Sequence, residues 1–190
     1  MEKKKYRSAV RYHGLIREAY LSLLREKPDG KISVTDVVNR AGINRSTFYS
    51  HYPDINGITE EFELEYAQRM MAVLANFDYA QFLEDPVVVL KVLNECIRQD
   101  EEIYRLLYRV RDMNPYLERL KNKILDFVLN HPSVPEQLSN SKTFRLRLFY
   151  FIGGITNCYQ QWLMGQLDCS LDDIAEELGH ITKPVSIEKS

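Results

Sequence analysis

The sequence lacks any apolar run near the roughly 20 residues that a membrane-spanning helix needs. Its charged N-terminus also lacks the apolar stretch of a signal peptide, so we expect a cytoplasmic protein. The cysteines, Cys96, Cys158 and Cys169, are odd in number and have no C-x-x-C spacing. This pattern favours reduced thiols over a disulfide framework, and a redox-sensing thiol stays open as the alternative.

The usual signatures of enzymes and metal proteins are absent from the sequence as well. It contains no phosphate-binding glycine loop, no carboxylate pair and no Ser/His/Asp set that can be assigned to catalysis. The four histidines, His13, His51, His131 and His180, are scattered and offer no zinc-ligand spacing. We therefore expect no enzyme, no metal site and no cofactor.

No strand-like alternation of useful length occurs, and nearly every segment has helical periodicity instead. The periodicity predicts helices at about 7–26, 56–77 and 143–165, among others, with Val10 and Ile16 buried on the first. We predict an all-α protein in which residues 1–54 form a three-helix domain. Residues 55–190 then form a helical bundle that dimerises.

Charge is divided unequally along the chain. Residues 1–52 hold 11 Lys and Arg against 5 Asp and Glu, or +6, and the remainder holds 14 against 22, or −8. A basic region on an acidic protein directs association with a polyanion. The basic arm Lys3–Arg7 either contacts such a partner or is a solvated tail, and the sequence leaves both readings open.

The stretch from Ser33 to Tyr52 predicts two short helices joined by a turn. Ser33 and Asp36 have the spacing of a capping box, and Asn44 is placed to cap the second helix. Between them, Gly42 can adopt a positive φ and reverse the chain. Two capped helices around a glycine turn are typical of a helix-turn-helix that inserts its second helix into the DNA major groove.

On the second helix, Phe48 should face the core while Ser46 and Ser50 lie opposite. Arg45 can reach a guanine edge bidentately, and the hydroxyl groups suit phosphates or thymine methyls. The alternative is a capped helical hairpin that does not bind DNA. The residues that we predict to contact DNA are Ser33, Thr35, Asn44, Arg45, Ser46, Thr47, Tyr49, Ser50 and His51.

The run AGINRSTFYSHYPD resembles the N-terminal motif of the tetracycline-repressor (TetR) family of bacterial transcription regulators, and the resemblance extends over about residues 7–62. It implies a sequence-specific DNA-binding regulator, by analogy a repressor. One position departs from the family pattern: Ile55 stands where the family usually carries a lysine that holds a phosphate. The resemblance therefore implies that affinity depends more on Tyr49, His51 and the basic arm.

The helix predicted at about 143–165 is apolar on most of its circumference, so it must be covered on more than one side. Gly153 and Gly154 cost about 1 kcal/mol each relative to alanine, which close approach of a second helix would offset. A self-complementary two-fold contact explains these features better than a monomer does, and the alternative is a helix buried within one subunit. A second capping box, Ser170 with Asp173, begins a last helix that we expect to stop at Gly179.

The stretch FYFIGGITNCYQQWLMGQLDCSLDDIAEEL resembles the last two helices of some TetR-family regulators, which build a four-helix bundle between two subunits. The resemblance implies a homodimer whose two reading helices lie about 34–36 Å apart on a palindromic operator. The interface residues that we expect are Phe151, Gly153, Gly154, Ile155, Cys158, Trp162, Ile174 and Leu178.

The resemblance also implies a small-molecule effector that binds among the C-terminal helices and releases the protein from its operator. The alternative partner is a co-regulator protein that senses the metabolite in its place. Each candidate lining residue also fits a plain core position. These candidates are Tyr66, Met70, Tyr104, Tyr108, Asn157 and Tyr159.

Overall fold

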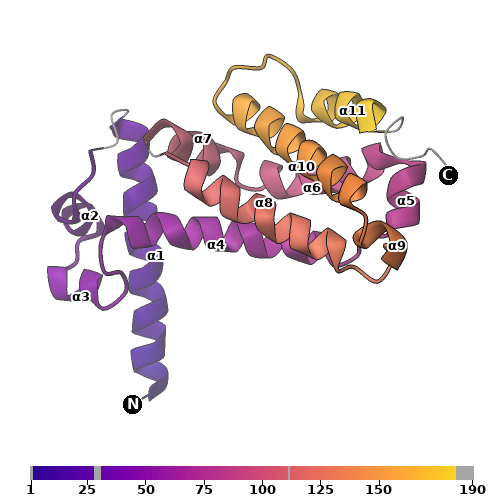
Figure 1. The fold of residues 1–190 in the computed structure, drawn as a ribbon. Helices are drawn as coiled ribbons and strands as arrows, with labels where there is room; N and C mark the ends of the chain where they lie inside the picture. The colour runs from indigo at the N-terminus through magenta and orange to yellow at the C-terminus, as the bar shows by residue number, and fades with distance from the viewer. Residues whose placement is uncertain (1, 28–30, 111, 183–190) are drawn as a thin grey trace. The chain divides into compact units, whose positions relative to one another are not determined.

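A computed structural model describes residues 2–27, 31–110 and 112–182 (Figure 1). The described residues contain helices and no strands, which confirms the all-α class. None of their helices is both long enough and apolar enough to cross a membrane. The helices are α1 Glu2–Glu26, α2 Val34–Ala41, α3 Arg45–Tyr49, α4 Ile55–Leu74, α5 Tyr79–Glu84, α6 Pro86–Arg98, α7 Glu101–Val110, α8 Asn114–Leu129, α9 Glu136–Ser139, α10 Lys142–Leu163 and α11 Leu171–Thr182.

The chain divides into two compact units. Unit 1 comprises Met1–Glu65 and Glu102–Asp112, and unit 2 comprises Tyr66–Glu101 and Met113–Ser190. This division differs from a boundary at residue 54, because the first half of α4 and most of α7 group with the N-terminal helices. A hydrogen bond within unit 1 joins α4 to α1. The Tyr20 hydroxyl of α1 lies 3.1 Å from Oγ1 of Thr59 on α4.

The core of unit 1 draws one fully buried side chain from each of its first four helices. Ile16, Val37, Phe48 and Ile58, from α1 to α4 in order, have no exposed surface. By contrast Val10 is 56% exposed, so the prediction that it is buried is wrong. Helix α1 begins at Glu2 rather than near residue 7, and its first turns extend beyond the residues that pack on α2 and α4 (Figure 1).

Unit 2 is built around α6, α8, α10 and α11. Helix α11 packs on α6, and α10 packs on α8. One core cluster joins Ile97, Trp162, Leu171 and Ile174 from three of these helices. The Trp162 indole also donates a hydrogen bond of 2.8 Å to the carbonyl of Cys169 and so fixes the segment before α11.

Helix α11 begins where the sequence predicts and ends later. Ser170 and Asp173 form the predicted capping box, with the Asp173 N–H 3.0 Å from the serine hydroxyl. The helix continues through Gly179 to Thr182, so the prediction that it stops at Gly179 is wrong. A Cβ at Gly179 would lie 2.4 Å from Cγ2 of Val87. The glycine therefore permits close approach of α11 and α6 rather than a helix end.

Candidate nucleic-acid interface

Helices α2 and α3 have the predicted caps and turn. The Ser33 hydroxyl accepts from the Asp36 N–H at 3.2 Å, and the Asp36 carboxylate accepts from the Ser33 N–H at 2.8 Å. The hydroxyl and then the backbone N–H of Ser33 hold the pKa of Asp36 well below its usual range. Gly42 has φ 63°, and the Asn44 side chain accepts from the Thr47 N–H at 2.7 Å. The local geometry is that of a helix-turn-helix.

Helix α3 is only five residues long and has two distinct faces. Phe48 is fully buried, whereas Tyr49 next to it is 55% exposed. Arg45, Ser46 and Ser50 are exposed as well. Because the buried phenylalanine fixes the rotation of so short a helix, the hydroxyl and guanidinium groups are held on the solvent side.

Several predicted contact residues already have hydrogen bonds inside the motif. Arg45 Nη2 donates to Oγ1 of Thr35 on α2 at 2.7 Å, and Ser46 Oγ donates to Oδ1 of Asn44 at 2.7 Å. Ser50 Oγ donates to the carbonyl of Thr47 at 2.7 Å. The side chains of Ser33, Asn44 and Ser50 therefore order the helix ends. All nine predicted residues lie within this one motif of unit 1.

A polar cluster that the sequence did not predict joins α1, α4 and the segment after α3. The Glu61 carboxylate on α4 accepts from Arg17 Nη1 at 2.6 Å and from the Tyr52 hydroxyl, and it lies 3.0 Å from His13 Nε2. Arg17 also donates to Glu65 at 2.5 Å and 2.7 Å. We call these five residues the Glu61 cluster. Its α1 residues lie 44 to 48 positions from the α4 residues that they contact, so no local sequence pattern indicates the cluster.

The cluster lies beside the last predicted contact residue, His51. The rings of His51 and His13 are 6.1 Å apart, and the His13 ring stacks on Tyr52 at 5.7 Å. Burial lowers the pKa of His51, and the neighbouring His13 lowers it further. Burial raises the pKa of Glu61, but hydrogen bonds from Tyr52, His13 and Arg17 outweigh it, so the net pKa is lowered. Glu61 is therefore held in its charged form, whereas burial and then His13 favour the neutral form of His51 against the opposing charge of Glu61.

The positive charge of the N-terminal region is partly offset within unit 1. The ranges 1–65 and 102–112 hold 14 Lys and Arg against 12 Asp and Glu, or +2, because they include the acidic residues of α4. Some basic residues are ion-paired: Arg40 lies 2.5 Å from Glu26, and Arg25 lies 2.6 Å from Glu102. Helix α1 includes the expected Lys3–Arg7 arm, but the arm's side chains lie outside the described part of the chain.

Ile55 is the first residue of α4. The carboxylate of the preceding Asp54 accepts from the Gly57 N–H at 3.1 Å, so this side chain caps the N-terminus of the helix. A negatively charged side chain therefore stands at this end of α4.

The expected dimer-interface residues separate into three groups. Trp162 and Ile174 are buried in the core of their own unit, with Cys158 and Leu178 packed against them. Trp162 and Ile174 thus have little exposed surface, and their place at an interface between subunits stays a prediction. Phe151 and Ile155 line a cavity, and a Cβ added at Gly153 or Gly154 would have open space around it, with no atom within 4 Å. The exposed apolar residues of α10 are instead Leu146, Phe149 and Tyr150.

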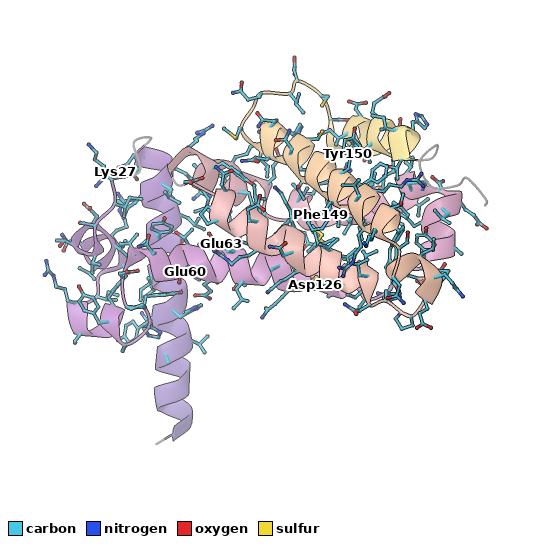
Figure 2. All side chains as sticks on the ribbon, viewed as in Figure 1. Lys27, Glu60, Glu63, Asp126, Phe149 and Tyr150 are labelled. Carbon is cyan, nitrogen blue, oxygen red and sulfur yellow. The ribbon has the colours of Figure 1, made fainter. Side chains whose placement is uncertain are left out.

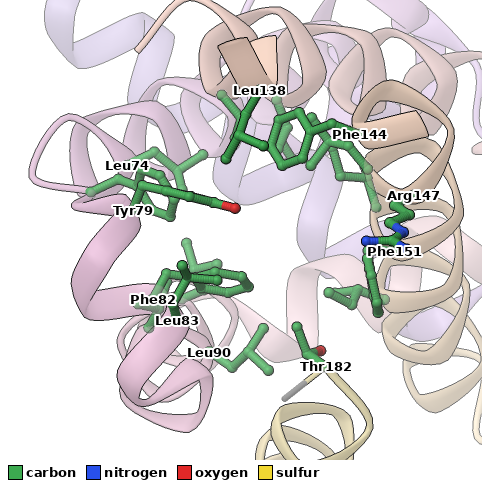
Figure 3. Close-up of a pocket in the computed structure, with 18 of the residues that line it drawn as sticks. Leu74, Tyr79, Phe82, Leu83, Leu90, Leu138, Phe144, Arg147, Phe151 and Thr182 are labelled. Carbon is green, nitrogen blue, oxygen red and sulfur yellow. The ribbon is translucent and has the colours of Figure 1, made fainter. Parts of the chain in front are cut away.

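The cavity lies within unit 2 and has a volume of about 460 Å³ (Figure 3). None of the six predicted ligand residues lines this cavity, so their role in binding a ligand stays a prediction. Tyr104 and Tyr108 belong to unit 1, Met70 is in a core cluster with Tyr66 against it, and Asn157 is exposed. The Tyr159 hydroxyl donates to Asn94 at 2.5 Å.

No family model matches the sequence. An alignment that covers 54% of this chain and 34% of the other protein gives 27% identity to the uncharacterized HTH-type transcriptional regulator YxbF of Bacillus subtilis. The match thus spans about a third of the relative's length.

Solved structures resemble the chain over most of its length. A putative TetR-family transcriptional regulator from Syntrophomonas wolfei has a TM-score of 0.71 at 15% identity, with 92% of this chain and 94% of that chain covered. A TetR transcriptional regulator from Streptococcus agalactiae has a TM-score of 0.64 at 20% identity, with 95% and 98% covered. The dihydroxyacetone kinase operon activator DhaS has a TM-score of 0.57 at 16% identity, with 90% and 93% covered. The chain therefore has the fold of the TetR-family regulators, as the resemblance of its sequence implied.

Proposed function

We propose that this protein is a sequence-specific DNA-binding transcriptional regulator of the TetR type that acts in the cytoplasm as a homodimer. The observation that carries the proposal is the two-faced helix α3, with Phe48 fully buried and Tyr49 exposed beside it. The fold of TetR-family regulators and the likeness to an HTH-type regulator both support it. Since these relatives are regulators, we propose no catalytic step for the chain.

In this proposal α3 enters the major groove and Arg45 reads a base edge. The arginine has five N–H donors, so its bond to Thr35 leaves donors for guanine O6 and N7. Tyr49, Thr47, Ser46 and His51 contact phosphates or thymine methyls. Ser33, Thr35, Asn44 and Ser50 act mainly by holding α2 and α3 in place.

We also propose that the subunits pair through α10. Leu146, Phe149 and Tyr150 are 72%, 56% and 71% exposed, and Figure 2 marks the last two on this helix. With Gly153 and Gly154 they follow the spacing of one helix face. Two copies of such a face are self-complementary about a two-fold axis, and the glycines let the backbones approach closely. Two half-sites on a palindromic operator follow from that symmetry.

Release from the operator by a small molecule is the regulation that we propose. The cavity in unit 2 favours a ligand sensor over a chain that relies on a co-regulator, because a volume of about 460 Å³ suits a small ligand. Repression is the proposed direction, by analogy with the family resemblance. Activation of transcription is the alternative, because DhaS, which has a similar fold, is named as an operon activator.

Selection from randomised duplex DNA tests the proposal. We expect the purified chain to enrich one inverted repeat whose half-sites lie about one helical turn apart. Affinity for that repeat should fall steeply with salt, because phosphate contacts release counterions. Failure to enrich any sequence, or binding that does not change with salt, would contradict DNA recognition by this chain.

A further inference from the structure

The walls of the cavity in unit 2 are mainly apolar. Residues of α4, α5, α6, α8 and α10 all contribute, and Figure 3 shows Leu74, Phe82, Leu90 and Phe144 around the space. The volume of about 460 Å³ admits a ligand of roughly 15 non-hydrogen atoms, at about 30 Å³ for a water-sized group.

Most hydroxyl groups at the cavity are already engaged by their own helices. Thr156 Oγ1 donates to the Ile152 carbonyl at 2.7 Å, and Thr182 Oγ1 donates to the Leu178 carbonyl at 2.6 Å. The Ser141 hydroxyl accepts from the Phe144 N–H and caps α10. These groups therefore add little polarity to the wall.

The other polar residues that line the space are Thr143, Tyr79 and Arg147. Arg147 of α10 is the one charged residue among the described residues that line the cavity. Figure 3 shows it across the opening from Tyr79 of α5, whose hydroxyl points inward. Burial raises the pKa of Tyr79, and the positive charge of Arg147 opposes that rise. The guanidinium thus gives this end of an apolar cavity a positive potential.

We propose that the cavity binds an apolar monocarboxylate, with its hydrocarbon body among the leucine and phenylalanine side chains and its carboxylate at Arg147. This inference rests on the proposed function, because it names the chemical class of the effector proposed for that regulator. A planar guanidinium pairs with a carboxylate through two parallel hydrogen bonds. A sugar or a zwitterion would leave polar groups unpaired against the apolar wall, and a neutral hydrocarbon would gain nothing from the positive potential at this end.

Calorimetric titration of the full chain with decanoate and with 1-decanol tests the proposal. The two probes share a hydrocarbon chain and differ in charge, since a carboxylate is ionised near neutral pH. We expect decanoate to bind at least about tenfold more tightly than decanol, as a charge-assisted hydrogen bond provides. Equal binding of both probes, or no binding of decanoate, would overturn the proposal.

Two substitutions on α10 separate a specific carboxylate site from general attraction of an anion. Arg147→Gln should weaken decanoate binding at least about tenfold and leave decanol unchanged. Arg145→Gln is the matched control, because Arg145 is exposed on the same helix and does not line the cavity. An equal loss in both variants, or full binding by Arg147→Gln, counts against a carboxylate held at Arg147.

A cavity-filling variant locates the hydrocarbon body. Ile155 lines the cavity and is only half-buried, so Ile155→Trp can fill the space with limited strain. We expect this variant to lose both probes while circular dichroism confirms that it is folded. If the helical spectrum is lost, the smaller Ile155→Phe gives the same comparison. Undiminished binding in a folded variant would place the ligand elsewhere and refute the site.

The effector role has its own measurement. Decanoate at saturation should change the affinity of wild-type protein for the selected DNA, because an effector must favour one conformation. Arg147→Gln should bind that DNA and show no response. Loss of DNA recognition refutes the proposed function, whereas DNA recognition without decanoate binding refutes only this inference.

Discussion

Nη2 of Arg45 lies 2.7 Å from Oγ1 of Thr35, so the first side chain of α3 is anchored to α2. This bond limits the conformations of a long, flexible side chain before any DNA is present. A pre-ordered side chain loses less conformational entropy on binding, which increases the discrimination that its remaining donors can provide. Base preference should therefore depend on both residues.

Arg45→Ala should relax base preference at one position of each half-site. A bidentate contact to guanine contributes about 1–3 kcal/mol of discrimination, so the preference for the selected base should fall by roughly 5-fold to 150-fold. Gel-shift titration against the selected DNA and single-base variants measures it. Thr35→Val should also reduce the preference for the selected base, but by less than Arg45→Ala does. An unchanged preference in Arg45→Ala would remove this residue from base recognition.

Adjacent substitutions on α3 should separate binding from folding. Tyr49→Ala removes an exposed ring and should weaken DNA affinity with little change in the free energy of unfolding. Phe48→Ala empties a fully buried position and should destabilise the protein by about 3–5 kcal/mol. Urea denaturation and gel-shift titration of both variants provide the comparison. If Tyr49→Ala instead lowered the free energy of unfolding and Phe48→Ala weakened only DNA binding, α3 would have a different rotation from the one described.

Gly154→Leu should weaken the dimer. A Cβ at Gly154 would have no atom within 4 Å in its own subunit, so the subunit itself tolerates a side chain there. A close approach of two α10 helices would not tolerate it. Analytical ultracentrifugation should show more monomer, while Gly14→Leu, at another glycine with open space around it, stays dimeric. Wild-type association of Gly154→Leu would argue against pairing through α10.

Gly179→Ala should destabilise the fold by about 1–3 kcal/mol. Its Cβ would meet Val87 Cγ2 at 2.4 Å and the Val87 backbone at 3.1 Å, so α11 and α6 must separate. Gly14→Ala is the control: it adds a methyl group in open space on α1 and should stabilise by about 0.5–1 kcal/mol. Thermal and urea denaturation measure both changes. If both substitutions changed the free energy of unfolding equally, helix propensity and not the contact with Val87 would account for the change.

Acid should destabilise the protein in two stages. The pKa of His51 is lowered from 6.5, so the unfolded chain binds this proton more readily and stability falls as the pH drops below that value. The pKa of Glu61 is lowered from 4.5, so a second loss begins below that pH. His51→Gln should remove the first stage, and His180→Gln on α11 is the control. Urea denaturation from about pH 7.5 to pH 4 would detect both stages. A stability that rises on acidification to about pH 5.5 would contradict the sign.

Local chemistry made the N-terminal motif predictable from sequence. Capping boxes, a positive-φ glycine and the 3.6-residue period involve neighbours along the chain, so Ser33, Gly42 and Phe48 could each be assigned. The pocket residues could not. A tyrosine at a helical spacing looks the same whether it packs in a core, as Tyr104 does, or faces a cavity, as Tyr79 does.

The helical class, the capped starts of α2, α3 and α11 and the two faces of α3 followed from the sequence, because each depends on residues within a few positions of one another. What lies opposite each helix emerged from the packing of the folded chain. That packing brought His13 to Glu61 across 48 positions, set Gly179 against Val87, and opened the cavity beside Arg147. Packing depends on how separate helices fit together, and that fit involves the shapes of side chains that lie far apart in the chain.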